Sequence, residues 1–139
     1  EMPVGTYKKA HRHGADFHVM CNTGCGYSLL WYENEEFVKV DWEHGTVFAP
    51  PDMMFHQHFN TAPDPSRYLA IACGGLRYPT MAEKRAVFSG MDVDVKKGGA
   101  QIEYGDQDKR IHENFLKELK KNGAQSKMGD MIDESQYSV

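Results

Sequence analysis

Five of the seven histidines in this chain fall in two short clusters. The first cluster contains His11 and His13, with His18 a few residues later, and the second contains His56 and His58. Side chains two residues apart in a β-strand point to the same face, so each His-x-His pair can present two imidazoles to one space. Neutral imidazole is a common ligand of iron, zinc, copper and nickel. Two strands that bring these pairs together would therefore enclose a divalent metal ion.

The same alternation places Asn60 on the face that His56 and His58 share. His58 and Asn60 are therefore predicted to contact the substrate, as catalytic residues beside the metal. His44 precedes a turn glycine and His112 lies in a helical pattern, so we expect both of these imidazoles to be solvated.

Short strands must position these side chains. Six segments are rich in aromatic or β-branched residues, with Gly, Pro, Asn and Asp between them. The segments are 17–20, 27–32, 37–40, 46–49, 54–59 and 68–72. Because no helical pattern separates them, they predict an all-β antiparallel sandwich or barrel, with residues 1–76 carrying both histidine clusters.

The character of the chain changes after this core. Residues 77–105 show no sustained period and are predicted to be an irregular extension. Residues 106–123 predict a C-terminal α-helix, with Asp108 as its cap, Gly123 as its end and apolar residues at helical spacing. Residues 124–139 predict a polar tail or an arm laid on a neighbour.

Composition narrows the class of function. A length of 139 residues suits one domain, and a formal net charge of −4 with no basic stripe argues against nucleic-acid binding. No run approaches the roughly 18 apolar residues of a membrane span. The three cysteines, of which Cys73 is the last, cannot all pair with one another. An odd count favours free thiols in a reducing compartment, and we expect a cytoplasmic protein.

Glycine and proline flank both histidine clusters at fixed offsets. Gly5 is followed by five residues and then by His11-Arg12-His13. The second pattern consists of Gly45, Pro51, His56 and Asn60. Together the two patterns, in register over about residues 5–75, resemble the two conserved motifs of the cupin superfamily.

The resemblance implies a fold and a metal site. The implied fold is a cupin double-stranded β-helix, or jelly-roll barrel, here followed by the C-terminal helix. The implied metal ligands are His11, His13 and His56. The chain departs from the first motif because its glutamate is absent, and either Phe17 or His18 takes that place. His18 can ligate a metal, so it is predicted as the fourth ligand, with Asp16 as a more distant candidate.

A second departure is Met53, which stands where the second motif has a glycine. We expect this substitution to alter a turn and to leave the ligands intact. Arg67 and Arg77 are candidates to pair with a substrate carboxylate.

The function that the resemblance implies is that of a metal-dependent enzyme. A site of neutral imidazoles favours a non-heme Fe(II) dioxygenase that acts with O2 on a small aromatic or carboxylated molecule. One alternative is a cupin isomerase or lyase that uses zinc, manganese or nickel. Another is a non-catalytic cupin module that binds a small molecule.

The first motif opens almost at the start of the given sequence. A cupin barrel has strands ahead of this motif, and a barrel without them would expose unpaired strand edges. We therefore expect a homo-oligomer, or association with a missing N-terminal cupin segment such as the first barrel of a two-barrel protein.

Overall fold

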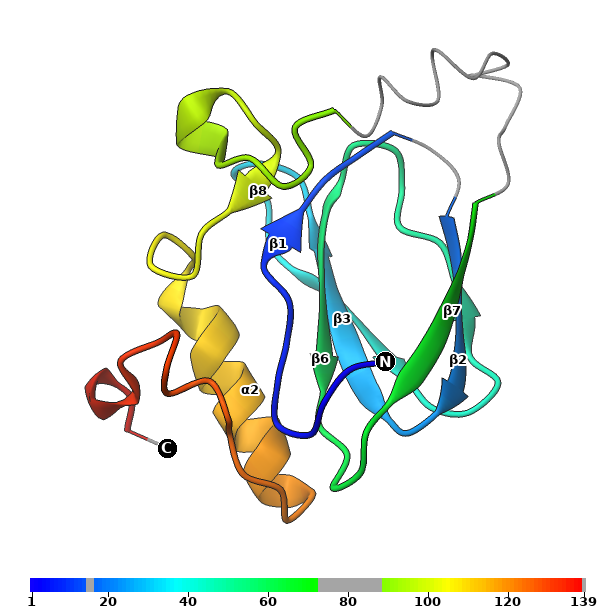
Figure 1. Ribbon diagram of the computed structural model, residues 1–139, viewed down its shortest axis with the longest axis vertical. Coiled ribbons are helices and arrows are strands. Elements are labelled where there is room, and N and C mark those ends of the chain that lie inside the picture. The colour runs from blue at the N-terminus through cyan, green and yellow to red at the C-terminus, as the bar shows by residue number, and fades with distance from the viewer. Residues whose placement is uncertain (15–16, 73–88, 139) are drawn as a thin grey trace.

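The computed structural model describes residues 1–14, 17–72 and 89–138, which form two antiparallel sheets and a helix (Figure 1). The larger sheet contains, in spatial order, β4 (Val38–Trp42), β3 (Gly26–Trp31), β6 (Phe55–Asn60), β1 (Ala10–His11) and β8 (Gln101–Ile102). The smaller sheet contains β5 (Val47–Phe48), β2 (Phe17–Thr23) and β7 (Arg67–Ala72). The sheets face each other, and the helix lies on the outer side of the larger one (Figure 1).

This arrangement confirms the coarse prediction of a mostly-β protein with a C-terminal helix. Each of the six strands expected from the sequence is present, with ends that differ by at most three residues. In the part of the chain that the structure describes, the strands of one sheet do not pair with those of the other, so no closed barrel is seen. The observed architecture is therefore a two-sheet sandwich.

Helix α2 (Lys109–Lys121) forms where the sequence predicts it. The Asp108 carboxylate caps the first turn by accepting the Arg110 backbone N–H at 2.8 Å, and Gly123 follows the last turn with φ of +67°. One face of the helix is buried on the larger sheet through Ile111, Phe115 and Leu119. Burying a side chain of this size contributes about 1.5–3 kcal/mol, so the packing anchors the helix to the sheet.

Strand β6 has one face on the hydrophobic core beneath α2 and the other face toward the smaller sheet. Phe55 and Phe59 belong to the hydrophobic core that includes α2. His56 and His58 alternate with them and face the smaller sheet, where the rings of His58 and Tyr68 on β7 lie 5.2 Å apart between centroids. The strand therefore separates an apolar core from a histidine-bearing face.

Residues 124–138 run back along α2 (Figure 1). Met128 is fully buried in the core, and the Lys127 backbone N–H donates to the Gly5 carbonyl at 2.8 Å. Gly5 has φ of +66°, and an added Cβ would lie 2.0 Å from the Gln125 oxygen, so only glycine fits there. The predicted polar tail is thus an ordered arm, which includes the 3-10 helix η2 (Glu134–Gln136).

The described portion of the predicted irregular extension contains η1 (Val95–Lys97) and β8. Its first part lies outside the described residues, as do Asp16, Cys73 and Arg77, on which expectations were stated above. Within the described residues, no helix has the length and apolar character that crossing a membrane requires.

Candidate metal centre

Three of the predicted ligands lie together. One ligand nitrogen from each of His11, His13 and His56 is within 4.8 Å of the others. The ring centroids of His56 lie 4.5 Å from His11 and 4.7 Å from His13, and the His11 and His13 centroids are 5.6 Å apart. Strand pairing produces this meeting, because β1 and β6 run antiparallel with His11 directly opposite His56. The two segments, 45 residues apart in sequence, form one potential site.

Each of these three rings is held by a backbone carbonyl. The contacts are His11 Nδ1 to Lys9 O (3.3 Å), His13 Nδ1 to Gly14 O (3.0 Å) and His56 Nδ1 to Met54 O (3.0 Å). A carbonyl oxygen only accepts, so each Nδ1 carries the proton and each Nε2 keeps its lone pair. Neutral rings in this tautomer are prepared to bind a cation through Nε2.

Burial keeps the same imidazoles neutral. His56 is 3% exposed, and burial together with the nearby His11 lowers its pKa to about 2. His11 and His13 are half-buried, and burial lowers the pKa of each from its ordinary value. At neutral pH no proton competes for the three lone pairs, while the partial exposure of two rings leaves the cluster open on one side.

A strained turn supports the second histidine segment. Met53 has φ of +57°, in the left-handed region, and stands where the cupin motif has a glycine. Its backbone N–H donates to the His13 carbonyl at 3.0 Å. This hydrogen bond links the turn before β6 to the segment that carries His13.

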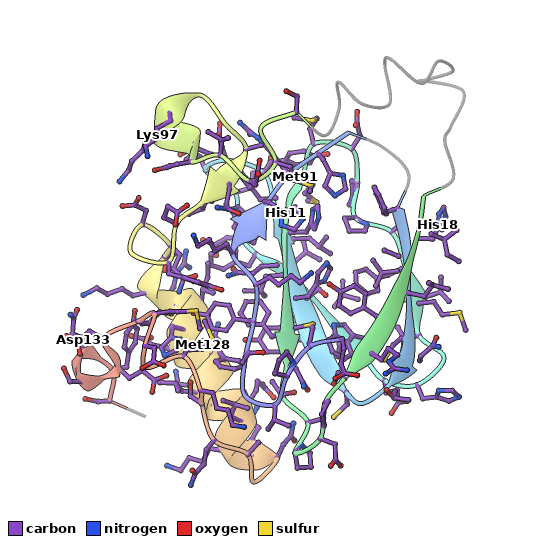
Figure 2. The ribbon with its side chains drawn as sticks, viewed as in Figure 1. His11, His18, Met91, Lys97, Met128 and Asp133 are labelled. Atoms are coloured by element: carbon purple, nitrogen blue, oxygen red, sulfur yellow. The ribbon has the colours of Figure 1, made fainter. Side chains whose placement is uncertain are left out.

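The prediction of His18 as a fourth ligand does not hold. Strand β2 alternates so that Phe17 faces the larger sheet, with its ring 5.0 Å from that of His13, whereas His18 is exposed on the outer face. Figure 2 shows His18 beyond β2 and β7, on the opposite side of these strands from His11. Of these two residues, Phe17 is the one that faces the cluster, and the described residues bring three histidines together rather than four.

Asn60 has a structural role instead of the predicted contact with substrate. Its side chain is fully buried, and its amide nitrogen donates to the backbone carbonyls of Met2, Pro3 and Asp64 at 3.0–3.1 Å. Its amide oxygen accepts from the Ala62 N–H and the Ser66 hydroxyl. The donors and the acceptor of this amide are therefore occupied. Through these hydrogen bonds, Asn60 connects the N-terminal segment to the turn after β6.

His58 lies beside the three clustered histidines but faces different partners. Its ring centroid is 5.6 Å from that of His56, and its Nδ1 is 2.7 Å from the Ser28 hydroxyl oxygen. Burial, with the nearby His11 and then Lys8 as smaller causes, lowers the pKa of His58 to about 3. His58 is therefore a neutral side chain that lines the space between the sheets.

Sequence reasoning missed Ser28, Trp42 and Lys8 around this site. The signal for Ser28 was available, because it is a small polar residue among the aromatic and aliphatic residues of a buried strand. Trp42 and Lys8 carried no pattern that separates them from other strand and surface residues. Trp42 comes near His58 only through the pairing of β3 with β4 and β6, and Lys8 only because the N-terminal segment lies along β6.

The remaining side chains lie away from the cluster. His44 is exposed, as expected, with Nδ1 2.7 Å from the Asn22 carbonyl. The expectation that His112 is solvated is wrong: it is fully buried between α2 and its neighbours, with Tyr7 Oη 2.9 Å from Nδ1 and a Glu134 oxygen 3.1 Å from Nε2. Arg67 is exposed and pairs with Glu1 at 2.8 Å.

Comparisons with family models and with curated proteins found no match for this chain, so the two histidine motifs and the geometry above are the basis for its function.

Proposed function

We propose that this chain is a metal-dependent enzyme of the cupin type, a non-heme Fe(II) dioxygenase acting on a small aromatic or carboxylated substrate. One observation carries the proposal: His11, His13 and His56 place their ligand nitrogens within 4.8 Å of one another. The two facing sheets are compatible with the jelly roll that the motifs imply.

The donor set fits a divalent transition metal. Three neutral imidazoles are typical ligands of iron, zinc, copper and nickel, and the backbone carbonyls that hold each Nδ1 orient the rings. The choice of iron rests on the resemblance to cupins. When bound, iron would supply the electron transfer to O2 that a dioxygenase needs.

Side chains near the three histidines would contact the substrate. The half-buried rings of Phe48 and Tyr68 lie 5.9 and 5.2 Å from His58 between centroids. They would offer a flat apolar surface beside His58, whose ring centroid lies 5.6 Å from that of His56. His58 adds one polar group to the surface that Phe48 and Tyr68 form.

A second candidate is an oxygen-independent isomerase or lyase that uses zinc, manganese or nickel. The observation that favours it is the donor set itself, because three histidines also form catalytic zinc sites with one open position. A non-catalytic module that binds a small molecule is the third outcome.

Metal analysis of protein purified without added metal separates the three candidates. Iron at one ion per chain, with O2 consumed in the presence of substrate candidates, supports the dioxygenase. Bound zinc, manganese or nickel with oxygen-independent turnover supports the second candidate, and a metal-free protein that resists loading contradicts both enzymes. His56→Ala should abolish metal binding, whereas His44→Ala, at an exposed histidine, should leave it unchanged.

A further inference from the structure

A hydrogen-bonded relay runs from β4 to His58. Ser28 lies directly opposite His58 across β3 and β6, and its Oγ is 2.7 Å from His58 Nδ1. The Trp42 indole N–H donates to the same Oγ at 3.1 Å. Ser28 is fully buried, and in the described part of the chain these are the two hydrogen-bond partners of its hydroxyl.

The direction of the relay follows from what each group can do. An indole N–H only donates, so the Ser28 oxygen accepts from Trp42. The buried Ser28 proton then has one acceptor within reach, which is His58 Nδ1. His58 must therefore carry its own proton on Nε2, the opposite tautomer from His56.

The His58 Nε2–H has no acceptor among the residues that the structure describes. The side chain is 5% exposed and its ring lies against Tyr68, Phe48 and His56, so Nε2 faces the space between the sheets. Nε2 is not among the fully buried side-chain atoms of the described residues that have no partner, so it keeps some accessible surface. A ligand with an acceptor atom can therefore accept a hydrogen bond from it.

Lys8 brings a positive charge to the same place. Tyr7 pairs with Phe59 and His11 pairs with His56. The N-terminal segment therefore spends four steps where β6 spends three, which is a β-bulge. Because of this extra residue, Lys8 and His11 face the same side. Lys8 Nζ lies 5.9 Å from the centroid of the Tyr68 ring, which also contacts His58. Among the described residues no carboxylate pairs with Lys8.

We infer that His58 and Lys8 form an acid-binding pair that holds the carboxylate of a small substrate whose flat apolar body lies on Tyr68. His58 Nε2–H donates one hydrogen bond to a carboxylate oxygen, and the Lys8 ammonium neutralises its charge. Ser28 and Trp42 are positioning residues, because they fix the tautomer of His58 without touching the ligand. The inference rests on the proposed function, since it treats the acid as the substrate of the metal-dependent enzyme.

The first test reads the tautomer directly. In ¹⁵N-histidine-labelled protein, both metal-free and loaded with diamagnetic zinc, the two ring nitrogens of His58 are identified by their loss in His58→Gln. We expect a protonated Nε2 and an unprotonated Nδ1, and mixed tautomers in Ser28→Ala. A protonated Nδ1 in the unsubstituted chain would overturn the inference.

The second test measures binding of benzoate and of its neutral isostere benzamide to the metal-loaded protein by calorimetry. Lys8→Met should weaken benzoate binding about tenfold or more and leave benzamide unchanged. The matched control is Lys9→Met, which removes a neighbouring lysine that pairs with Glu103, and it should have no effect. His58→Leu should weaken benzoate similarly, and His58→Gln, which restores an N–H donor, should recover part of the loss.

Failure of this inference differs from failure of the proposed function. If the protein binds metal but does not prefer benzoate over benzamide, or if Lys8→Met and Lys9→Met behave alike, the acid-binding pair is refuted and the metal site stands. If the chain binds no metal but retains a Lys8-dependent preference for benzoate, the enzyme proposal fails and the acid-binding pair stands. Because Lys8 is exposed, Lys8→Met decides the matter even if His58→Leu does not fold.

Discussion

His56 and His58 lie two residues apart on one face of β6, and their hydrogen bonds hold the two imidazoles in opposite tautomers. His56 donates Nδ1–H to the Met54 carbonyl and keeps a lone pair on Nε2, whereas His58 accepts at Nδ1 from Ser28 and keeps a proton on Nε2. One residue can therefore bind a cation and the other can donate to a ligand. A single His-x-His pair supports two different chemical tasks.

The turn at Met53 should become more stable when it receives the glycine of the motif. Met53→Gly relieves a left-handed φ of +57°, and the Met53 side chain is 43% exposed, so little packing is lost. We expect the free energy of unfolding to rise by about 0.5–1 kcal/mol, measured by chemical denaturation. Asn34→Gly is the matched control, because Asn34 has a similar φ of +66° but asparagine tolerates this region. An equal or larger gain at Asn34 would contradict the explanation from strain.

Acid should destabilise the metal-free protein through its buried histidines. The pKa of His58 is about 3 in the folded chain and about 6.5 when unfolded, so between these values the unfolded state binds more protons. The free energy of unfolding should therefore be highest above about pH 6.5 and fall as the pH decreases toward 3. His58 contributes at most about 1.4 kcal/mol per pH unit in this window.

The measurement for this pH effect compares urea denaturation from pH 7 to pH 4 in the unsubstituted chain and in His58→Gln. The variant should lose stability less steeply as the pH falls. If the free energy of unfolding of His58→Gln fell with pH as steeply as that of the unsubstituted chain, this would contradict the burial of a neutral imidazole.

Restoring a carboxylate to the first motif should strengthen metal binding at the position that the structure identifies. Phe17 faces His13 with 5.0 Å between ring centroids, whereas His18 is exposed on the outer face of β2. Phe17→Glu should raise the affinity for a divalent metal about tenfold or more, because a carboxylate would be added beside the imidazoles. His18→Glu adds the same charge one residue later and should leave the affinity unchanged, as should His18→Ala. Isothermal titration calorimetry with zinc measures the affinity of the three variants and of the unsubstituted chain.

The sequence predicted the elements better than it predicted the roles of single residues. Strands, helix and capping residue follow from local patterns, and Asp108 caps α2 as expected. The grouping of His11, His13 and His56 was also predictable from the motif offsets, although only His11 and His56 lie on paired strands and His13 follows two residues after the end of β1. The choice between Phe17 and His18 was not, since a shift of one residue reverses which side chain faces inward.

The other errors concern contacts between distant segments. Asn60 shares the correct face, but its partners lie in the N-terminal segment and in the turn after β6, which strand alternation does not reveal. His112 is buried because the C-terminal arm, through Glu134, covers it. Helical periodicity already places His112 on the apolar side, because it lies three residues before Phe115 and seven before Leu119, so the expectation of a solvated ring overlooked this spacing.

The central claim is that His11, His13 and His56 bind one metal ion through Nε2. X-ray absorption spectroscopy of the metal-loaded protein tests this claim most directly, because the scattering pattern of imidazole rings reports how many histidines coordinate the ion. We predict one ion per chain with three imidazole ligands, and the loss of bound metal in His56→Ala. A stoichiometric ion with fewer than two imidazole ligands, or full occupancy retained in His56→Ala, would contradict the account.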